Sequence, residues 1–190
     1  MISPNLFENS DMVDAYFPPG AWYDFWTYTR QWTSGKWTRI PAALDEIPIH
    51  IRGGSVIPRQ VPALNTVATR KSPFEIVFAL DAVESAKGQL YLDDGESLDV
   101  GKESTIVEFR ATPRRLSSSV KQDLWSGAKD LTIQKFSVLG IYKQPSAVSV
   151  NGQPVSFNYT DQGTLFITGL NLPINKDFIV TWRETTAAQQ

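Results

Sequence analysis

Apolar and polar residues alternate along most of the chain, and this pattern predicts strands. Residues 74–80 (FEIVFAL), 105–111 (TIVEFRA) and 177–182 (DFIVTW) are three examples. The side chains of a strand point to its two faces in turn, so we expect one face of each segment to be buried. No long window places its apolar residues at helical spacing. We therefore expect an all-β protein built from two antiparallel β-sandwich domains in tandem.

The boundary between the two domains is expected where this alternation weakens. Polar residues become more frequent from Arg59 to Ser72, as in a segment that crosses between two units. We place the boundary near residue 67, which gives one domain in residues 1–67 and another in residues 68–190. In the second domain Asn151-Gly152 is the strongest hairpin signal, because both residues tolerate the positive φ of a type I′ turn.

Aromatic residues are concentrated in residues 15–37, which hold nine of the chain's 22. Trp22 to Tyr28 is predicted to be one strand with aromatic side chains on both faces, as in a strand that is covered on both sides. Ser34-Gly35 fits a two-residue hairpin that would set Trp32 across from Trp37. We interpret the cluster mainly as packing, and the alternative is a stacking surface for sugar rings. Trp32 and Trp37 are the candidate substrate-binding residues.

Asp24 and His50 are the two polar residues in the first domain that we consider as candidates for ion pairing or catalysis. Asp24 stands among the aromatic residues, and a buried carboxylate needs a partner, which Arg30 or Arg52 could supply. His50 is the only histidine. It is predicted to lie on the polar face of a strand that bends at Gly53-Gly54, and we interpret it as structural, because no nucleophile in a suitable motif accompanies it.

The run LDDGES at residues 92–97 is the most conspicuous polar motif. Asp93 and Asp94 are neighbours on a strand, so their side chains leave on opposite faces and make a poor pair of catalytic carboxylates. Asp94-Gly95 is typical of a turn. The alternative is a calcium site, for which the motif supplies only part of the ligand set.

Composition excludes several classes of protein. The chain has 190 residues without cysteine, so neither disulfides nor thiolate metal sites are possible. With one histidine and no cysteine, we expect no metal and no cofactor. The formal charge of −2 gives no basic field for nucleic acid. No apolar run is long enough to span a bilayer, so we expect no membrane partner.

Three motifs occur in an order and at spacings that resemble a known family. They are YFPPGAWYDFW (residues 16–26), IPAALDEIPIHIRGGSVIPRQ (residues 40–60) and LYLDDGES (residues 90–97). Together they resemble the C-terminal region of family 31 glycoside hydrolases, in particular the eukaryotic α-glucosidases. The resemblance is firm from about residue 13 to residue 110 and looser afterwards.

The resemblance implies a non-catalytic role for the chain. Members of the family carry their nucleophile and acid/base on a (β/α)₈ barrel, which precedes a proximal and a distal C-terminal β-sandwich. No catalytic residue can be transferred to this sequence. Residues 2–4 resemble the segment that leaves the barrel, and the aromatic stretch is expected to face it. The implied partner is the catalytic barrel, in the same or a processed chain, with an α-glucan oligosaccharide as an alternative ligand. An extracellular or lysosomal location is also implied.

Overall fold

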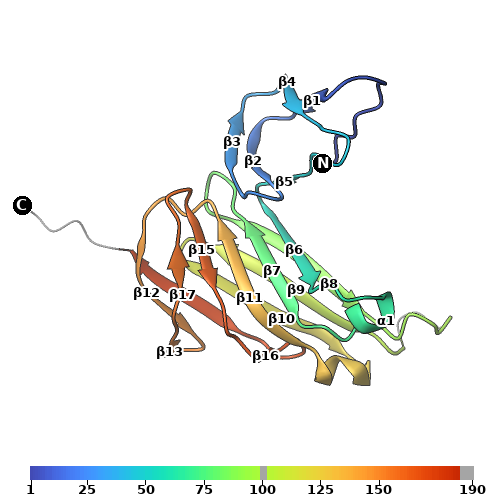
Figure 1. The fold of residues 1–190 in the computed structure, drawn as a ribbon. Coiled ribbons are helices and arrows are strands. Elements are labelled where there is room, and N and C mark those ends of the chain that lie inside the picture. Colours follow the sequence, from blue (N-terminus) through green and yellow to red (C-terminus); the bar gives the residue numbers. More distant parts are fainter. Residues whose placement is uncertain (99–101, 185–190) are drawn as a thin grey trace, which may run out of the picture.

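Two β units of unequal size make up the protein (Figure 1). The structure is a computed structural model that describes residues 1–98 and 102–184. Strands β1 to β5 form two small sheets within residues 1–52, called here the smaller unit. Strands β6 to β17 form one extended sheet within residues 55–184, called here the larger unit. The prediction of an all-β protein is confirmed.

The smaller unit is made of antiparallel pairs. Its strands are β1 (Met12–Phe17), β2 (Gly20–Asp24), β3 (Arg30–Thr33), β4 (Lys36–Pro41) and β5 (His50–Arg52). Strand β1 pairs with β4, whereas β2 lies between β3 and β5. Phe17, Trp22 and Ala15 are buried between these two sheets and form a small core.

The larger unit contains the remaining strands and two short helical elements. Its strands are β6 (Ser55–Gln60), β7 (Phe74–Ala79), β8 (Ala86–Leu92), β9 (Thr105–Thr112), β10 (Arg115–Asp123), β11 (Thr132–Leu139), β12 (Pro145–Val150), β13 (Gln153–Pro154), β14 (Asn158–Tyr159), β15 (Thr164–Ile167), β16 (Leu172–Pro173) and β17 (Ile179–Glu184). The helical elements are α1 (Thr66–Thr69) and the 3₁₀ helix η1 (Ser126–Asp130). Strand β6, which precedes the predicted boundary near residue 67, pairs with β7.

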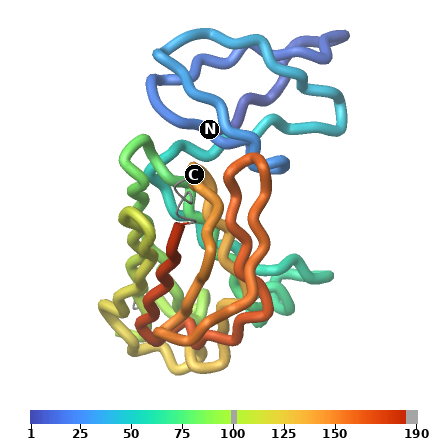
Figure 2. Tube along the Cα trace, turned by 90° about the vertical axis from the view of Figure 1, so that its left-hand side faces the viewer, coloured from blue at the N-terminus to red at the C-terminus, as the bar shows by residue number. Residues whose placement is uncertain are grey.

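The sheet of the larger unit folds over into two layers, which Figure 2 shows side by side beneath the smaller unit. One layer follows the order β12-β17-β10-β9-β8 and the other the order β6-β7-β11-β15. Most pairs are antiparallel, but β7 runs parallel to β11, a feature that the sequence did not indicate. Between the layers lies the main core, which includes Phe78, Phe109 and Phe136.

A second core joins the two units. Ala21, Tyr23 and Ile51 of the smaller unit are buried against Val77, Ala79 and Leu139 of the larger unit. Because this contact is apolar and closed to water, it holds the units in one arrangement. We call this core the seam.

Two turns confirm predictions made from the sequence. Asn151 (φ 49°) and Gly152 (φ 80°) have the positive φ angles of a type I′ turn and connect β12 to β13. Gly53 and Gly54 form the predicted bend between β5 and β6. A side chain at Gly53 would meet the Leu80 carbonyl oxygen at 2.9 Å, so the close approach of the two units requires glycine there.

The predicted extent of the aromatic strand is wrong. Strand β2 ends at Asp24, and residues 25–27 form a turn that is followed by Tyr28 at φ 60°. The predicted pairing of Trp32 with Trp37 is also wrong. Trp32 lies opposite Ala21 on β2, and Trp37 lies opposite Tyr16 on β1, because the two halves of this hairpin join different sheets.

Candidate functional site: an exposed apolar flank

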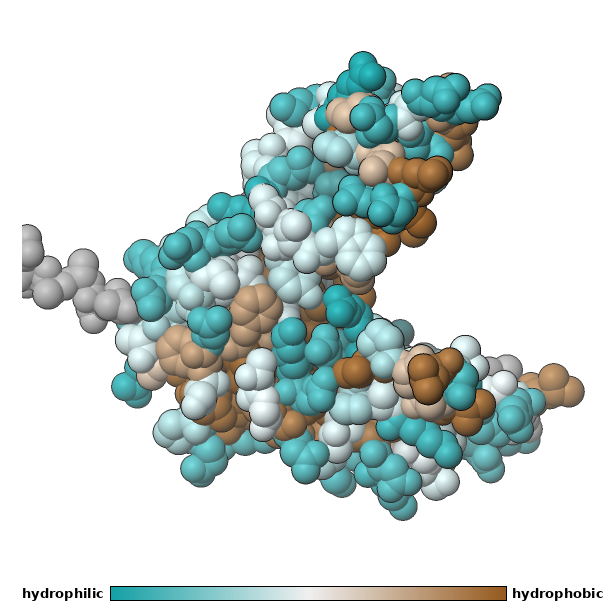
Figure 3. All heavy atoms as spheres, in the orientation of Figure 1, coloured by the Kyte–Doolittle hydropathy of each residue, from teal (hydrophilic) through white to brown (hydrophobic). Residues whose placement is uncertain are grey.

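The smaller unit exposes an unusual amount of apolar surface. Ten of the 18 large apolar side chains that are exposed in the described part of the chain belong to residues 1–47. We call one group of them the apolar flank, and it consists of Met1, Ile2, Leu6, Phe7, Trp26, Leu44 and Ile47. In Figure 3 apolar side chains gather on the right-hand side of the smaller unit, and the molecule is hollowed between this side and the larger unit.

Two segments without long strands support the flank. Residues 1–11 run beside residues 42–50 and are joined to them by backbone hydrogen bonds: Ser3 N–H donates to the Pro48 carbonyl (3.0 Å), and Ala42 N–H donates to the Asp11 carbonyl (2.7 Å). These bonds satisfy the backbone, so the segments are fixed while their apolar side chains stay in contact with solvent. An apolar surface of this kind typically marks an interaction site.

Asp24 places Trp26 on the flank. Its Oδ1 accepts hydrogen bonds from the backbone N–H groups of Trp26 (2.9 Å) and Thr27 (2.6 Å), and from the Thr27 hydroxyl (2.9 Å). The turn that these bonds stabilise directs Trp26 outward, where its indole N–H donates to the Ile47 carbonyl (3.2 Å). The predicted arginine partner of Asp24 is therefore wrong, since backbone and hydroxyl donors satisfy this carboxylate.

The two candidate tryptophans are exposed but lie in different surroundings. Trp37 is 70% exposed and lies against the Tyr16 ring, with the ring centroids 5.6 Å apart. Trp32 is 59% exposed and lines a hollow of about 300 Å³ beside the seam. The structure thus does not bring them together, because each belongs to a different sheet.

His50 is buried, not on a polar face as predicted. Only 8% of it is exposed, and its ring meets the Phe17 ring edge-on at a centroid distance of 4.8 Å. Burial lowers the pKa of His50, and the nearby Asp24 carboxylate opposes this shift. Its Nδ1 has no hydrogen-bond partner within the described residues. These surroundings indicate a neutral, structural histidine.

The acidic motif forms a turn, as predicted. Asp94 Oδ1 accepts hydrogen bonds from the backbone N–H groups of Glu96 (3.0 Å) and Ser97 (2.9 Å). The Ser97 hydroxyl and these two N–H groups lower the pKa of Asp94 to about 2. A carboxyl group with so low a pKa cannot act as a general acid near neutral pH. Within the described residues no group of three acidic or histidine side chains is placed to hold a metal ion.

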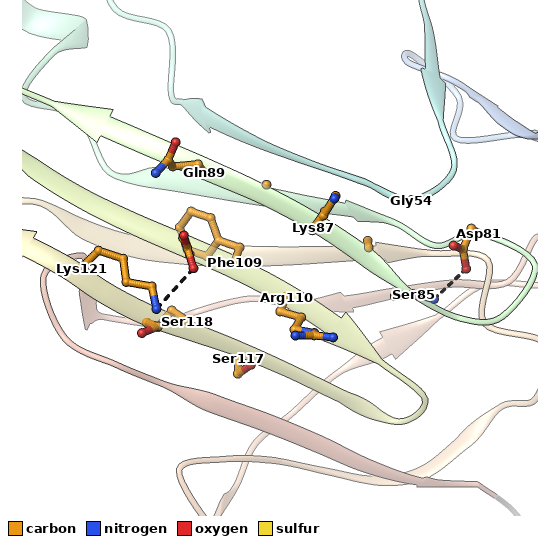
Figure 4. A pocket seen from close by; sticks show the side chains of 14 residues that line it. Gly54, Asp81, Ser85, Lys87, Gln89, Phe109, Arg110, Ser117, Ser118 and Lys121 are labelled. Carbon is orange, nitrogen blue, oxygen red and sulfur yellow. Dashed lines mark hydrogen bonds and ion pairs between the residues drawn. The ribbon is translucent and has the colours of Figure 1, made fainter.

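Another hollow, lined mostly by polar and charged residues, lies on the outer face of β8, β9 and β10 (Figure 4). Its volume is about 960 Å³. Lys87 lies opposite Arg110 in the strand register, and Lys121 forms an ion pair with Glu108 (3.4 Å). Its one aromatic residue, Phe109, is buried in the core. This hollow therefore offers no ring on which a sugar could stack, and we interpret it as a solvated sheet face.

These observations define a class of protein: an all-β chain of two units joined by a buried apolar seam, with a large uncovered apolar surface. Within the described residues no helix is long and apolar enough to cross a membrane. Residues 1–57 match the family described as the glycosyl hydrolase family 31 C-terminal domain. The resemblance to the C-terminal region of family 31 glycoside hydrolases that the sequence motifs indicated is thereby confirmed.

Similar proteins extend this likeness over nearly the whole chain. Glucoamylase 1 of Candida albicans is 38% identical over 175 residues, which are 90% of this chain and 18% of that protein. The lysosomal alpha-glucosidase of Bos taurus is 34% identical over 202 residues, which are 96% of this chain and 21% of that protein. The chain therefore spans only a minor part of the length of these relatives.

A solved structure confirms the shared fold. The crystal structure of the glucosidase II alpha subunit superposes with a TM-score of 0.82 at 22% identity, over 95% of this chain and 22% of that one. Both β units are included in a match of this extent. The arrangement of the units is thus the one found within a much longer chain.

Proposed function

We propose that this chain is a non-catalytic β region of a retaining α-glucosidase, which stabilises the catalytic barrel by packing against it. The parent enzyme would hydrolyse terminal α-1,4-linked glucose. Support comes from the names of the relatives, among them Glucoamylase 1 and lysosomal alpha-glucosidase, and from the small share of their length that the chain spans. The two domains of the proposal are the proximal sandwich in residues 1–67 and the distal one in residues 68–190, with β6 of the first range pairing with β7 of the second.

The apolar flank is the observation that carries the proposal. Leaving large apolar side chains in water is unfavourable by roughly 25 cal/mol per Å² of apolar surface, so covering them against another domain would stabilise both partners. The hollow beside the flank offers a concave seat for a compact partner (Figure 3). The seam joins the smaller unit, which carries the flank, to the larger unit on the other side of this hollow.

Three of the carboxylates that line hollows have structural partners, which supports a non-catalytic role. Glycoside hydrolysis needs two carboxyl groups that flank one bond, one of them free to give a proton. Asp94 is held by its turn, and Glu108 is paired with Lys121. Asp81 Oδ1 accepts hydrogen bonds from the Val83 and Ser85 N–H groups. Each of these carboxylates already has a structural partner.

Complex formation tests the proposal. The chain is mixed with a form of Candida albicans Glucoamylase 1 that lacks the matched region, and binding is followed by analytical ultracentrifugation. We expect a complex with the unchanged chain and at least tenfold weaker binding by Ile47→Lys, since a lysine on the flank must lose its hydration. Ile179→Lys, an equivalent change at an exposed position of the larger unit, serves as the matched control.

An activity assay supplies the second test. The purified chain is incubated with maltose and with a nitrophenyl α-glucoside, and we expect no turnover above the buffer rate. Enzyme-like turnover by the chain alone would refute the non-catalytic assignment. Equal binding by the two lysine variants would instead refute the role of the flank.

One observation favours a second candidate function, an α-glucan-binding module. Trp32 is exposed beside a hollow, whereas Trp37 is exposed against another ring. Equilibrium binding of maltooligosaccharides separates this function from the packing role, which predicts no sugar affinity.

A further inference from the structure

The hollow beside Trp32 has the composition of a sugar subsite. Its lining includes Trp32, Asp81 and Val83, together with Ala21 and Gly53. Its volume of about 300 Å³ is at the small end of the range for ligand pockets, roughly 300–1,000 Å³. The hollow is therefore of a size for one ring and not for a long chain.

The local sequence explains how the residues that line the hollow pack together. Trp32 on β3 lies opposite Ala21 on β2, and the Gly53 N–H donates to the Ala21 carbonyl (2.8 Å), so the large Trp32 side chain lies near an alanine and a glycine. A Cβ atom at Gly53 would lie 3.0 Å from the Ala21 Cβ and 2.9 Å from the Leu80 carbonyl oxygen. Gly53 thus allows the chain to pack closely on Ala21 and on the Leu80 backbone within the lining of the hollow.

Asp81 has one carboxylate oxygen that is still able to accept hydrogen bonds. Its Oδ1 accepts hydrogen bonds from Val83 N–H (3.0 Å) and Ser85 N–H (2.8 Å), which fix the carboxylate on its loop. Its Oδ2 has no protein donor within the described residues, so it can accept hydrogen bonds from a ligand. Figure 4 shows Asp81 and its bond to Ser85 at the end of the neighbouring polar face.

The charge of the hollow indicates a neutral ligand. Arg52 and Asp81 are its two charged lining residues and cancel each other. The Arg52 guanidinium lies 5.9 Å from the centroid of the Trp22 ring, so it is held in place by a second aromatic side chain. An aromatic ring beside a fixed carboxylate suits the apolar face and the hydroxyl groups of a pyranose.

We propose that Trp32 and Asp81 form a subsite for one pyranose ring of a neutral oligosaccharide. The Trp32 ring packs against the apolar face of the sugar, and Asp81 Oδ2 accepts hydrogen bonds from its hydroxyl groups. The hollow itself is independent of the packing role, because its lining residues are not those of the apolar flank. Only the choice of an α-linked probe rests on the proposed function.

The test follows the indole N–H signals of the six tryptophans by NMR while maltotriose is added to the purified chain. We expect the Trp32 signal to shift with saturation, and Trp32→Ala to weaken binding at least tenfold. Trp37→Ala is the matched control, since Trp37 is more exposed but lies outside the hollow, and it should bind as the unchanged chain does. Asp81→Asn keeps the acceptor for Val83 and Ser85 and should weaken binding severalfold.

Each outcome bears on the proposal. Binding of cellobiose but not maltotriose through Trp32 supports the subsite and counts only against the α-linked preference. No saturable shift with either sugar, a shift centred on another tryptophan, or equal losses in the Trp32 and Trp37 variants would overturn it. So would a larger Trp32 shift with inorganic phosphate than with sugar. A dispersed amide spectrum for each variant shows that it is folded.

Discussion

The Tyr23 hydroxyl donates a 2.7 Å hydrogen bond to the backbone carbonyl of Leu80, across 57 positions of sequence. Tyr23 belongs to the smaller unit, and Leu80 follows β7 of the larger one. Both residues are almost fully buried, with Tyr23 1% exposed. Burial raises the pKa of Tyr23 to about 12, although Arg30 opposes the shift, so the hydroxyl is protonated and donates at neutral pH. This bond fixes the two units to each other within an otherwise apolar seam.

Tyr23→Phe should therefore weaken the seam. Removing the hydroxyl leaves the Leu80 carbonyl buried without this donor, which costs about 1–3 kcal/mol in the free energy of unfolding. Urea unfolding measures the loss. Tyr91→Phe, which changes an exposed tyrosine whose hydroxyl makes no hydrogen bond to the described residues, is the control and should be nearly neutral. Equal stability of the Tyr23→Phe variant and the unchanged chain would contradict a structural role for the bond.

Gly140→Ala should destabilise the seam for a related reason. A Cβ at Gly140 would lie 2.1 Å from the Tyr23 hydroxyl oxygen, and φ at Gly140 is +92°. Gly169→Ala is a matched control, because Gly169 has φ +72° with nothing within 4 Å of an added Cβ, and there only backbone strain of about 1–2 kcal/mol is expected. The larger loss at Gly140 should shrink in a Tyr23→Phe background. Equal losses at the two glycines would show that the clash is absent.

The stability of the protein should depend on pH through His50. Burial lowers the pKa of His50 in the folded state below its ordinary value of 6.5. As pH falls through that value, the unfolded chain binds a proton that the folded chain excludes, so the free energy of unfolding decreases. Urea unfolding between about pH 8 and about pH 5 should show a steeper decrease in the unchanged chain than in His50→Gln. Parallel curves would contradict the prediction.

The turn at Asp94 makes a separate electrostatic prediction. Since the Ser97 hydroxyl is the main cause of its low pKa, Ser97→Ala should raise the pKa of Asp94 from about 2 toward its ordinary value of 3.8. The backbone N–H of residue 97 remains in the variant, so part of the depression should persist. NMR titration of the side-chain carboxyl carbon provides the measurement. An ordinary pKa in the unchanged chain would show that the turn is not formed in solution.

Local patterns predicted some parts of this molecule well. Asn151-Gly152 and Gly53-Gly54 form turns where the sequence predicted them, because the ability to adopt positive φ depends on the residue type itself. His50 was predicted on the wrong side of its strand. Period-two alternation gives two faces but does not say which is covered. Here both are covered, because Phe17 packs on His50 while Ile51 on the other face is also buried.

The candidate tryptophans also show the difference between what local sequence predicts and what the tertiary structure decides. Trp32 and Trp37 looked equivalent in sequence, as two aromatic residues flanking Ser34-Gly35. Their strands pair with β2 and β1 in separate sheets, so one ring lines a hollow with Asp81, and the other lies on Tyr16. Trp32 and Asp81 are far apart in the chain, and neither segment alone indicates that they line the same hollow.

The sequence by itself determined the strand-rich class, the tight turns and the family, because alternation, glycine conformation and short motifs depend on neighbouring residues. Only the tertiary structure decided which apolar side chains are left uncovered. It also decided which carboxylates are already satisfied and how the two units are joined. These properties depend on sheet order and on contacts such as that of Tyr23 with Leu80, where residues distant in the chain exclude water together.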